Sequence, residues 1–193
     1  MSDTYHHGNL REALIETGIR IINESGENAL SLRKVAAACD VSHAAPYAHF
    51  KDKDELIEAI KKSITGQLME ELEDAVKSAA DSESAIVNMG KRYVSFFHGN
   101  PDYYKFLFGR QNIIAHLKID EKTDEDYPPF VLLKKTYLKY LKECGIKKNK
   151  KDQEVELLKI WASAHGLAAI ACMSGVVPSF DWDEMLEGDK LLR

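Results

Sequence analysis

Residues 43–49, with the sequence HAAPYAH, combine small apolar side chains with side chains that form hydrogen bonds. Alanine methyl groups fit against the methyl group of thymine, and a tyrosine hydroxyl can donate to a phosphate. The major groove of DNA admits a helix and presents a distinct pattern of donors and acceptors for each base pair. The segment therefore favours recognition of a base sequence, with His43, Ala44 and Ala45 as the expected base-edge residues.

A helix before this segment would help to position it. Ser31 can cap that helix, because a serine hydroxyl accepts a hydrogen bond from a free N–H of the first turn. The apolar residues that follow recur on one helical face, at Leu32, Val35, Ala36 and Cys39. Asp40 and Val41 interrupt this periodicity, which indicates a turn.

A second and a third helix are expected after the turn. Ser42 is a candidate cap for a helix over residues 43–49, which is too short to be stable alone and must dock on its neighbours. Asp52 and Glu55 form a variant capping box that opens a long helix. Helix, turn and short helix together are the outline of a helix-turn-helix DNA reader, whose second helix enters the major groove.

The residues expected to contact DNA lie in and around the short helix. They are Ser31, Arg33, Ser42, His43, Ala44, Ala45, Tyr47, His49, Lys51 and Lys53. Tyr47 and His49 could instead complete the small core, and the two lysines could be ordinary surface residues. Phe50 and Val41 are assigned to the core.

Residues 31–56 resemble the DNA-binding segment of the TetR family of transcriptional regulators. The resemblance rests on Leu32, Arg33, Val35, Ala36, Val41, Ser42, Tyr47, Phe50, Lys53 and Leu56. Residues 5–26 resemble the first helix of the same family, and Gly26 is expected to end that helix. Asp40 stands where the family usually has glycine, and aspartate tolerates the left-handed conformation that such a turn requires. Pro46 lies inside the short helix, where a first-turn proline loses no helical hydrogen bond.

The remainder of the chain predicts further helices and no strands, so the expected fold class is all-α. We expect a helix-turn-helix domain over residues 1–55 and a helical effector-binding and dimerisation domain over residues 56–193. Predicted elements of the second domain are helices at 84–98, 131–144 and 153–174, an aromatic segment after Pro101, a short piece at 113–117, and a solvated basic loop at 147–151.

The second domain resembles the WHG-type ligand-binding domain of a branch of the TetR family. The residues that carry this resemblance are Phe96, His98, Asn100, Pro101, Tyr104, Phe106 and Phe108, together with Trp161, His165 and Gly166. The resemblance implies an unidentified small-molecule effector, and the aromatic lining favours a largely apolar or aromatic one. Its expected contacts are Tyr93, Phe97, Tyr104, Phe108, Trp161 and His165, any of which could instead be an ordinary core residue.

The resemblance also implies a homodimer. In this family the closing helices of two subunits form a four-helix bundle, which assigns residues 153–174 and 180–192 to the interface. Residues 155–173 are apolar on nearly every helical face, so this helix must be buried on two sides. A two-fold dimer would bind a palindromic double-stranded operator, most simply as a repressor released by its effector.

Composition excludes several other classes. The chain has 193 residues, of which 45% are hydrophobic and 30% charged, which is typical of a globular protein. No apolar run could span a membrane, so we expect a cytoplasmic protein without a membrane partner. The three cysteines are far apart and are expected to be thiols. No motif for catalysis, a metal or a cofactor is present, and Ser163 does not face His165 on a helix.

An effector-independent DNA-organising protein is the alternative reading. The net charge of −5 argues against it, because binding without sequence preference depends on a strongly basic surface. A few local cations, Arg33, Lys34, Lys51 and Lys53, can still hold a specific site.

The histidines predict a pH dependence of DNA binding. His6, His7, His43 and His49 lie in or near the expected reader, and protonation would add positive charge facing the phosphates. We expect tighter DNA binding at pH 6 than at pH 8, measured at fixed salt. Equal affinity across that range would reject the hypothesis.

Overall fold

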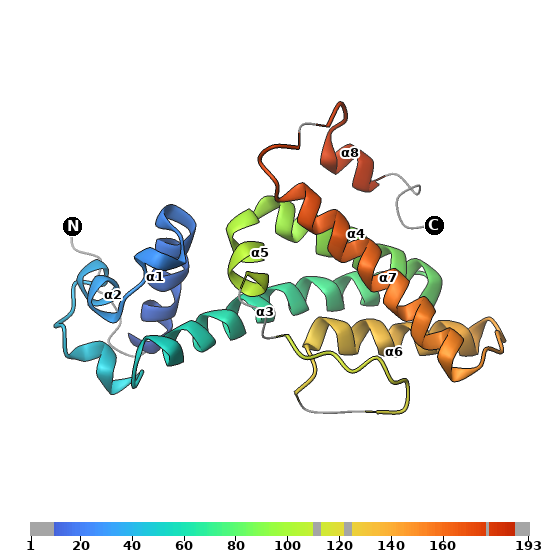
Figure 1. Ribbon diagram of the computed structural model, residues 1–193, viewed down its shortest axis with the longest axis horizontal. Helices are drawn as coiled ribbons and strands as arrows, with labels where there is room; N and C mark the ends of the chain where they lie inside the picture. Colours follow the sequence, from blue (N-terminus) through green and yellow to red (C-terminus); the bar gives the residue numbers. More distant parts are fainter. Residues whose placement is uncertain (1–9, 110–112, 122–124, 177, 188–193) are drawn as a thin grey trace. The chain divides into compact units, whose positions relative to one another are not determined.

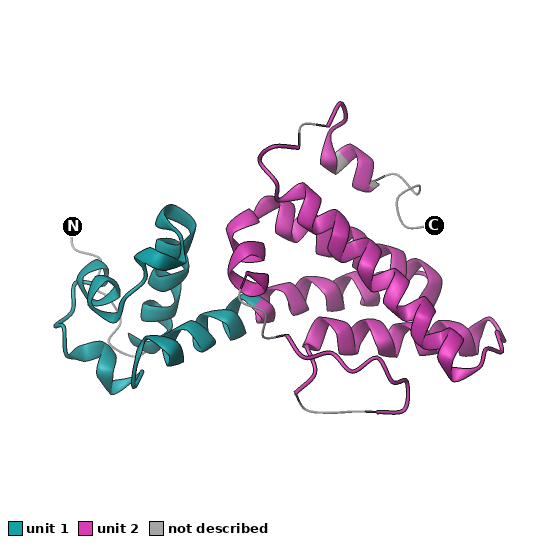
Figure 2. Ribbon diagram, in the orientation of Figure 1, with its two compact units in different colours: residues 1–64 teal, residues 65–193 magenta. Residues whose placement is uncertain are grey.

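The computed structural model describes residues 10–109, 113–121, 125–176 and 178–187. Every regular element within these ranges is helical (Figure 1), so the predicted all-α class is confirmed. The chain divides into two compact units, Met1–Ile64 and Thr65–Arg193 (Figure 2). The division falls inside helix α3 (Lys53–Lys77), so this helix contributes to both units.

The N-terminal unit contains α1 (Leu10–Ser25), α2 (Leu32–Ala38), the start of α3, and the 3₁₀ turns η1 (Glu27–Ala29) and η2 (Ala45–Ala48). As predicted, α1 ends before Gly26, which has a positive φ of 75°. Gly18 lets α1 approach α3 closely, because a Cβ atom there would lie 2.5 Å from Cδ1 of Ile60. The core of this unit is made by Leu14, Ile22, Leu30, Val35, Phe50, Leu56 and Ile60.

The C-terminal unit is built around α4 (Ser82–Gly99). Helices α6 (Pro128–Glu143) and α7 (Lys150–Ala171) pack against it, as do the shorter α5 (Pro101–Phe108) and α8 (Trp182–Glu187). Asp81 and Ser84 form a capping box that begins α4. Gly145, with a φ of 62°, follows the end of α6 at the predicted stop.

Several predicted elements differ in the structure. Helix α6 begins at Pro128, because proline is favoured in a first turn, whose N–H groups have no helical partner. Helix α7 begins at Lys150 inside the predicted basic loop, since the Asn149 side chain accepts a hydrogen bond from the Asp152 N–H. Residues 113–117 have no regular secondary structure.

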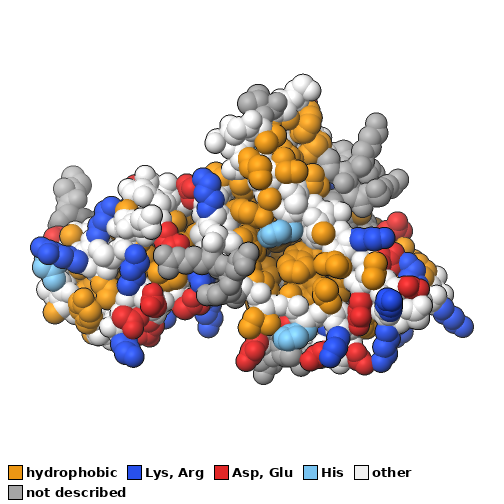
Figure 3. Space-filling model, in the orientation of Figure 1, with side chains coloured by type: hydrophobic (Ala, Val, Ile, Leu, Met, Phe, Trp, Pro, Cys, Tyr) orange, Lys and Arg blue, Asp and Glu red, His pale blue; other side chains and the backbone are white. Residues whose placement is uncertain are grey.

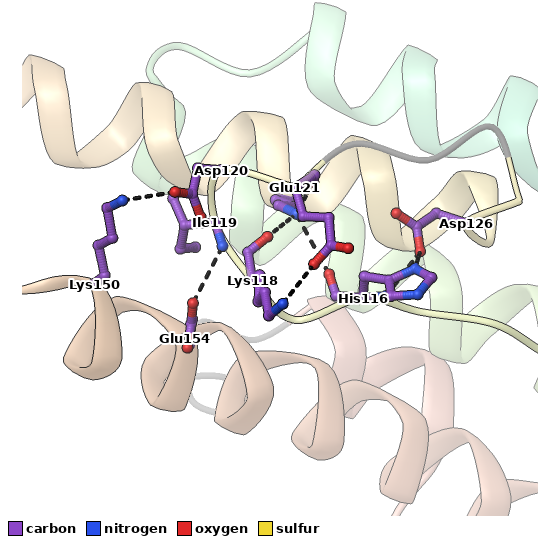
Figure 4. A network of polar contacts seen from close by, with 9 residues as sticks. His116, Lys118, Ile119, Asp120, Glu121, Asp126, Lys150 and Glu154 are labelled. Carbon is purple, nitrogen blue, oxygen red and sulfur yellow. Dashed lines mark hydrogen bonds and ion pairs between the residues drawn. The ribbon is translucent and has the colours of Figure 1, made fainter.

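A buried lysine organises the loop between α5 and α6, and Figure 4 shows polar contacts of His116, Lys118 and Glu121 in this loop. Lys134 of α6 is only 7% exposed, and its ammonium donates to the backbone carbonyls of His116, Lys118 and Glu121. Asp126 accepts from the backbone N–H of His116 at 2.7 Å and contacts its Nδ1 at 2.8 Å. Burial disfavours the charged Asp126, but the contacts with His116 hold the pKa of its carboxyl below the ordinary value. Three backbone carbonyls of the loop therefore surround the ammonium group of Lys134.

The same loop is also joined to α7. Lys150 contacts the Asp120 carboxylate at 2.6 Å, and the Ile119 N–H donates to Glu154 at 3.3 Å. Both contacts come from the first turns of α7 (Figure 4).

None of the helices among the described residues is both long enough and apolar enough to cross a membrane. Cys39, Cys144 and Cys172 are free thiols.

Replacement of Lys134 by methionine is expected to destabilise the protein. Methionine fills a similar volume but leaves three loop carbonyls without their donor, a cost of about 1–3 kcal/mol for a buried unpaired group. Urea unfolding of K134M would measure it, with K135M as the control because Lys135 is exposed on the same helix. Equal stability of K134M and K135M would contradict the assigned role.

Candidate nucleic-acid interface and ligand cavity

The first helix of the reader begins as the sequence predicts. The Ser31 hydroxyl accepts a hydrogen bond from the backbone N–H of Lys34 at 3.1 Å. Leu32 and Val35 are buried, whereas Arg33 is exposed. The cap marks the start of α2, whose apolar stripe faces the core while the cationic side chain of Arg33 lies in solvent.

Asp40 forms the turn after α2. Its φ of 54° lies in the left-handed region, as expected for a residue at the position where the family usually has glycine. The Val41 N–H then donates to the Ala36 carbonyl at 3.0 Å and closes the turn. A short polar side chain makes this backbone conformation accessible, so the departure from glycine leaves the turn intact.

The short reading helix is a 3₁₀ turn, Ala45–Ala48, and not the longer helix predicted over residues 43–49. The Tyr47 N–H donates to the Ala44 carbonyl at 3.1 Å, the i to i+3 contact of a 3₁₀ helix. The expectation that Ser42 caps this helix is wrong, because Ala44 occupies the cap position and no side chain caps it.

Exposure distinguishes reading residues from core residues in this segment. Tyr47 is 60% exposed, which rules out the alternative that its ring completes the core, whereas Phe50 is 1% exposed and does so. The other predicted DNA contacts are also accessible: Arg33, Ser42, His43, Ala44 and Lys51 are exposed, while Ser31, Ala45, His49 and Lys53 are half-buried. Their contact with DNA stays a prediction. His6 and His7 lie outside the described residues.

The start of α3 holds the two lysines that follow the turn. The Glu55 N–H donates to Asp52 Oδ1 at 2.9 Å, and the Glu55 carboxylate accepts from the Lys51 N–H at 2.6 Å. The predicted capping box is therefore present, although it reaches back to residue 51 and not to residue 52. The hydrogen bond to Glu55 fixes the backbone of Lys51 close to the 3₁₀ turn Ala45–Ala48, which is called the reading turn below.

The C-terminal unit contains a cavity of about 440 Å³. It lies among α3, α4, α6 and α7, and its wall is mostly aliphatic and aromatic. The lining residues are Leu72, Glu83, Ile86, Val87, Met89, Gly90, Tyr93, Pro129, Phe130, Leu133, Tyr137, Tyr140, Glu156, Lys159, Ile160, Trp161, Ser163 and Ala164. Its size and apolar lining are those of a site for a small organic molecule.

The six predicted effector residues divide into two groups. Tyr93 and Trp161 line the cavity. Phe97, Tyr104, Phe108 and His165 do not line it; they form an aromatic cluster in contact with Tyr93, in which the Phe108 and His165 rings are 4.6 Å apart. The sequence analysis missed Phe130 and Tyr137, although both lie on the apolar face of α6 and could have been found by its periodicity.

His165 joins the cluster to the cavity wall through hydrogen bonds at both ring nitrogens. The Tyr93 hydroxyl lies 3.0 Å from Nδ1, and the Tyr104 hydroxyl lies 2.9 Å from Nε2. Burial lowers the pKa of His165, which favours the neutral ring. A neutral imidazole has one donor and one acceptor, so one tyrosine donates to His165 and the other accepts from it.

The charged side chains that line the cavity are Glu83 of α4 and Glu156 and Lys159 of α7. The Glu156 carboxylate accepts from the Tyr137 hydroxyl and contacts Lys148 Nζ at 2.5 Å. Burial opposes ionisation of Glu156, but these two partners hold the pKa of its carboxyl below the ordinary value. Glu83 and Lys159 are exposed.

The described chain thus consists of a helix-turn-helix unit followed by a helical unit that contains a cavity of about 440 Å³. Residues 14–60 match the family model for bacterial regulatory proteins of the tetR family. The N-terminal unit therefore carries the DNA-binding segment of bacterial regulatory proteins of the TetR family. The match ends before the cavity, so the narrower WHG-type resemblance stays a prediction.

Two curated relatives match in part. The nicotine-responsive transcriptional repressor HdnoR of Paenarthrobacter nicotinovorans is 34% identical over 109 residues, which cover 56% of this chain and 52% of HdnoR. The transcriptional regulator BetI of Rhizobium meliloti is 29% identical over 89 residues, covering 45% of this chain and 44% of BetI. The matches thus span about half the length of these relatives.

Solved structures share the fold along nearly the whole chain. A transcriptional regulator of the TetR/AcrR family from Thermobifida fusca superposes with a TM-score of 0.65 at 15% identity, covering 93% of both chains. At this identity the likeness concerns the fold alone.

The environment of His165 predicts an acid-sensitive stability. Burial lowers the pKa of His165 in the folded protein, whereas histidine in the unfolded chain titrates at about 6.5. As the pH falls, the unfolded chain therefore takes up the proton first. The contribution of neutral His165 is complete above that value and is lost below it. Thermal unfolding measured between pH 5 and 8 should show that the melting temperature of H165Q falls less at acid pH than that of the wild type. H43Q is the control because His43 is exposed. If the melting temperature of H165Q depended on pH as steeply as that of the wild type, this prediction would be contradicted.

Proposed function

We propose that this protein is a TetR-type transcriptional repressor that binds a palindromic operator as a homodimer and is released by a small, largely apolar or aromatic effector. The observation that carries the proposal is the apolar cavity in a chain whose N-terminal unit matches the family of bacterial regulators. Functionally, residues 1–55 bind DNA, and residues 56–193 bind the effector and the second subunit.

Residues around the reading turn supply the DNA contacts. His43, Ala44 and Ala45 face base edges, while the exposed Tyr47 reaches the sugar-phosphate backbone or a base edge. Ser31, Arg33, Ser42, His49, Lys51 and Lys53 hold phosphates on either side. With a net charge of −5 the protein has little general attraction for DNA, so specific contacts carry most of the affinity.

The outer face of α7 is the proposed dimer interface. Val155, Leu158 and Ile170 are each more than 40% exposed in the single chain, and so are Met173, Val176 and Phe180 after the helix. Hydrophobic side chains gather over α7 and the segment that follows it in the face seen in Figure 3. A helix that is apolar on its inner and outer faces needs a second partner, and an identical subunit provides one through a two-fold axis.

Effector binding is proposed to act through α3. This helix contributes Leu56 and Ile60 to the core of the N-terminal unit and Leu72 to the cavity wall. An effector that fits only one position of Leu72 would favour one conformation of the helix, and only such a preference can shift the DNA-binding equilibrium. A coupling of about 1–3 kcal/mol changes DNA affinity by roughly five- to 150-fold. The relative HdnoR carries a name that describes this behaviour, a repressor that responds to a small molecule.

Selection from genomic DNA tests the proposal. The full chain is mixed with sheared DNA from its source at near-physiological salt, and the retained fragments are sequenced. We expect a few enriched sites that share an inverted repeat, and the neighbouring genes would indicate effectors to try. Diffuse retention would favour the DNA-organising alternative, and absent retention would contradict DNA recognition.

Two variants separate the parts of the proposal. Y47A should lose the enriched sites while remaining a dimer in analytical ultracentrifugation. L158E should sediment as a monomer and lose the inverted repeat, because a buried unpaired carboxylate opposes association. E73Q is the matched control, since Glu73 is an exposed residue of α3 and does not line the cavity. A dimeric L158E would overturn the assigned interface.

A further inference from the structure

The cavity of the C-terminal unit has a polar end, where the start of α4, the second half of α6 and the first two turns of α7 meet. The Ser82 hydroxyl donates to the Glu143 carboxylate, which joins the start of α4 to the end of α6. The Tyr137 hydroxyl donates to the Glu156 carboxylate, which joins α6 to α7. These three helix segments supply the lining residues Glu83, Tyr137, Tyr140 and Glu156.

The opposite end of the cavity is aromatic. Phe130, at the start of α6, has its ring centroid 4.9 Å from that of Trp161 on α7, and both rings line the wall. Tyr93 of α4 lines the wall as well, and its hydroxyl is bonded to His165. A ligand with an apolar body and one polar group can therefore lie along the cavity, with the body against these rings and the polar group near Glu156.

One oxygen of the Glu156 carboxylate is occupied, and the other is available. The Tyr137 hydroxyl and Lys148 Nζ both contact Oε2, the latter at 2.5 Å. Neither contact involves Oε1, which has no hydrogen-bond partner among the described residues. Lys148 is not one of the residues that line the cavity, so it holds the carboxylate from outside the wall. The half-buried Glu156 thus offers an oriented anionic acceptor to a ligand.

The lining favours a ligand cation over a ligand anion. Lys159 is the cation of the wall, but its side chain is exposed and forms no ion pair among the described residues. An anion would have to order this long side chain, whereas Glu156 is already held by two partners and would lose little freedom on binding a cation. Glu83 adds a second carboxylate to the same end.

Aromatic rings in the wall favour a cation for an independent reason. Tyr137, Tyr140 and Trp161 line the cavity, and the hydroxyl of Tyr137 contacts Glu156 directly. The faces of aromatic rings carry partial negative charge and attract ammonium groups, while they repel carboxylates. An ammonium group beside Glu156 can therefore meet a carboxylate oxygen and aromatic rings together.

We propose that the cavity binds an organic amine, whose apolar or aromatic body lies against Phe130 and Trp161 and whose protonated amino group donates a hydrogen bond to Oε1 of Glu156. This rests on the proposed function in one respect, namely that the cavity is the effector site. It adds the chemical class of the effector and the residue that fixes its orientation.

Four probes with one carbon skeleton separate the possible ligand classes. They are 4-phenylbutan-1-amine, which is a cation; 4-phenylbutan-1-ol, which is a neutral donor; butylbenzene, which has no polar group; and 4-phenylbutanoate, which is an anion. Isothermal titration calorimetry on the full chain measures their affinities at neutral pH. We expect the amine to bind about tenfold more tightly than the alcohol, because only the amine pairs opposite charges, and the anion to bind more weakly than both.

The variant E156Q identifies the acceptor. It removes the charge but keeps the size of the side chain and an oxygen for the Tyr137 hydroxyl, so it should lower amine affinity about tenfold. Butylbenzene affinity should not change, which would show that the variant folds and keeps its cavity. E154Q is the matched control, because Glu154 lies on the same helix, accepts from the Ile119 N–H and does not line the cavity.

The variant K159Q tests the opposite choice of charge. If Glu156 holds the ligand, K159Q should leave amine affinity equal to or higher than that of the wild type. If Lys159 held the ligand, the anion would bind best to the wild type and would lose affinity in K159Q. Lys159 is exposed, so this substitution leaves the core intact.

Each outcome has a distinct meaning. If the amine binds best and E156Q, but not E154Q, removes its advantage over the alcohol, the inference is supported. If the wild type binds amine and alcohol equally, binds the anion best, or keeps its amine affinity in E156Q, the inference is overturned while the cavity remains the proposed effector site. If none of the four probes binds, the inference is overturned and the proposed effector site falls with it.

Discussion

Helix α3 is the element on which the rest of the structure depends, because one uninterrupted helix supplies core residues to both units. Leu56 and Ile60 are completely buried in the N-terminal unit, and Leu68 is completely buried in the C-terminal unit. A helix transmits displacement along its axis because its backbone hydrogen bonds resist bending. The start of this helix is itself fixed by the capping contacts of Asp52 and Glu55.

Hydrogen bonds of polar side chains in apolar surroundings hold together several elements of the C-terminal unit. His165 is satisfied by two tyrosines, and Lys134 by three carbonyls. Such groups are tolerated only when their partners are held in place, so they fix the positions of α4, α5, α6 and the loop between the last two. Among the described residues of this unit, the Tyr127 hydroxyl and Nδ1 of His98 are buried without a hydrogen-bond partner.

The helix-turn-helix motif is kept although two of its residues, Asp40 and Pro46, are unusual at their positions. Asp40 adopts the left-handed conformation at the turn, and Pro46 lies in a 3₁₀ turn where a longer helix was expected. Both act on the backbone and leave the buried contacts of Val35 and Phe50 in place. The side chains proposed to contact DNA therefore lie on or beside a 3₁₀ turn, which is wound more tightly than an α-helix. Tyr47 is the most exposed large side chain of this turn.

The sequence by itself determined the features that depend on neighbouring residues: the cap at Ser31, the stop at Gly26, the turn at Asp40, the all-helical class and the TetR resemblance. These are local, since a cap or a positive φ is decided within a few residues. Tertiary structure alone decided which aromatic side chains face the cavity. Helical periodicity shows that Phe97 and Phe108 are on apolar faces, but it cannot show that they pack against each other, at 5.6 Å, and leave the cavity wall to Phe130 and Tyr137. That choice depends on how α4, α5, α6 and α7 pack together, and so does the burial of the Tyr127 hydroxyl without a partner.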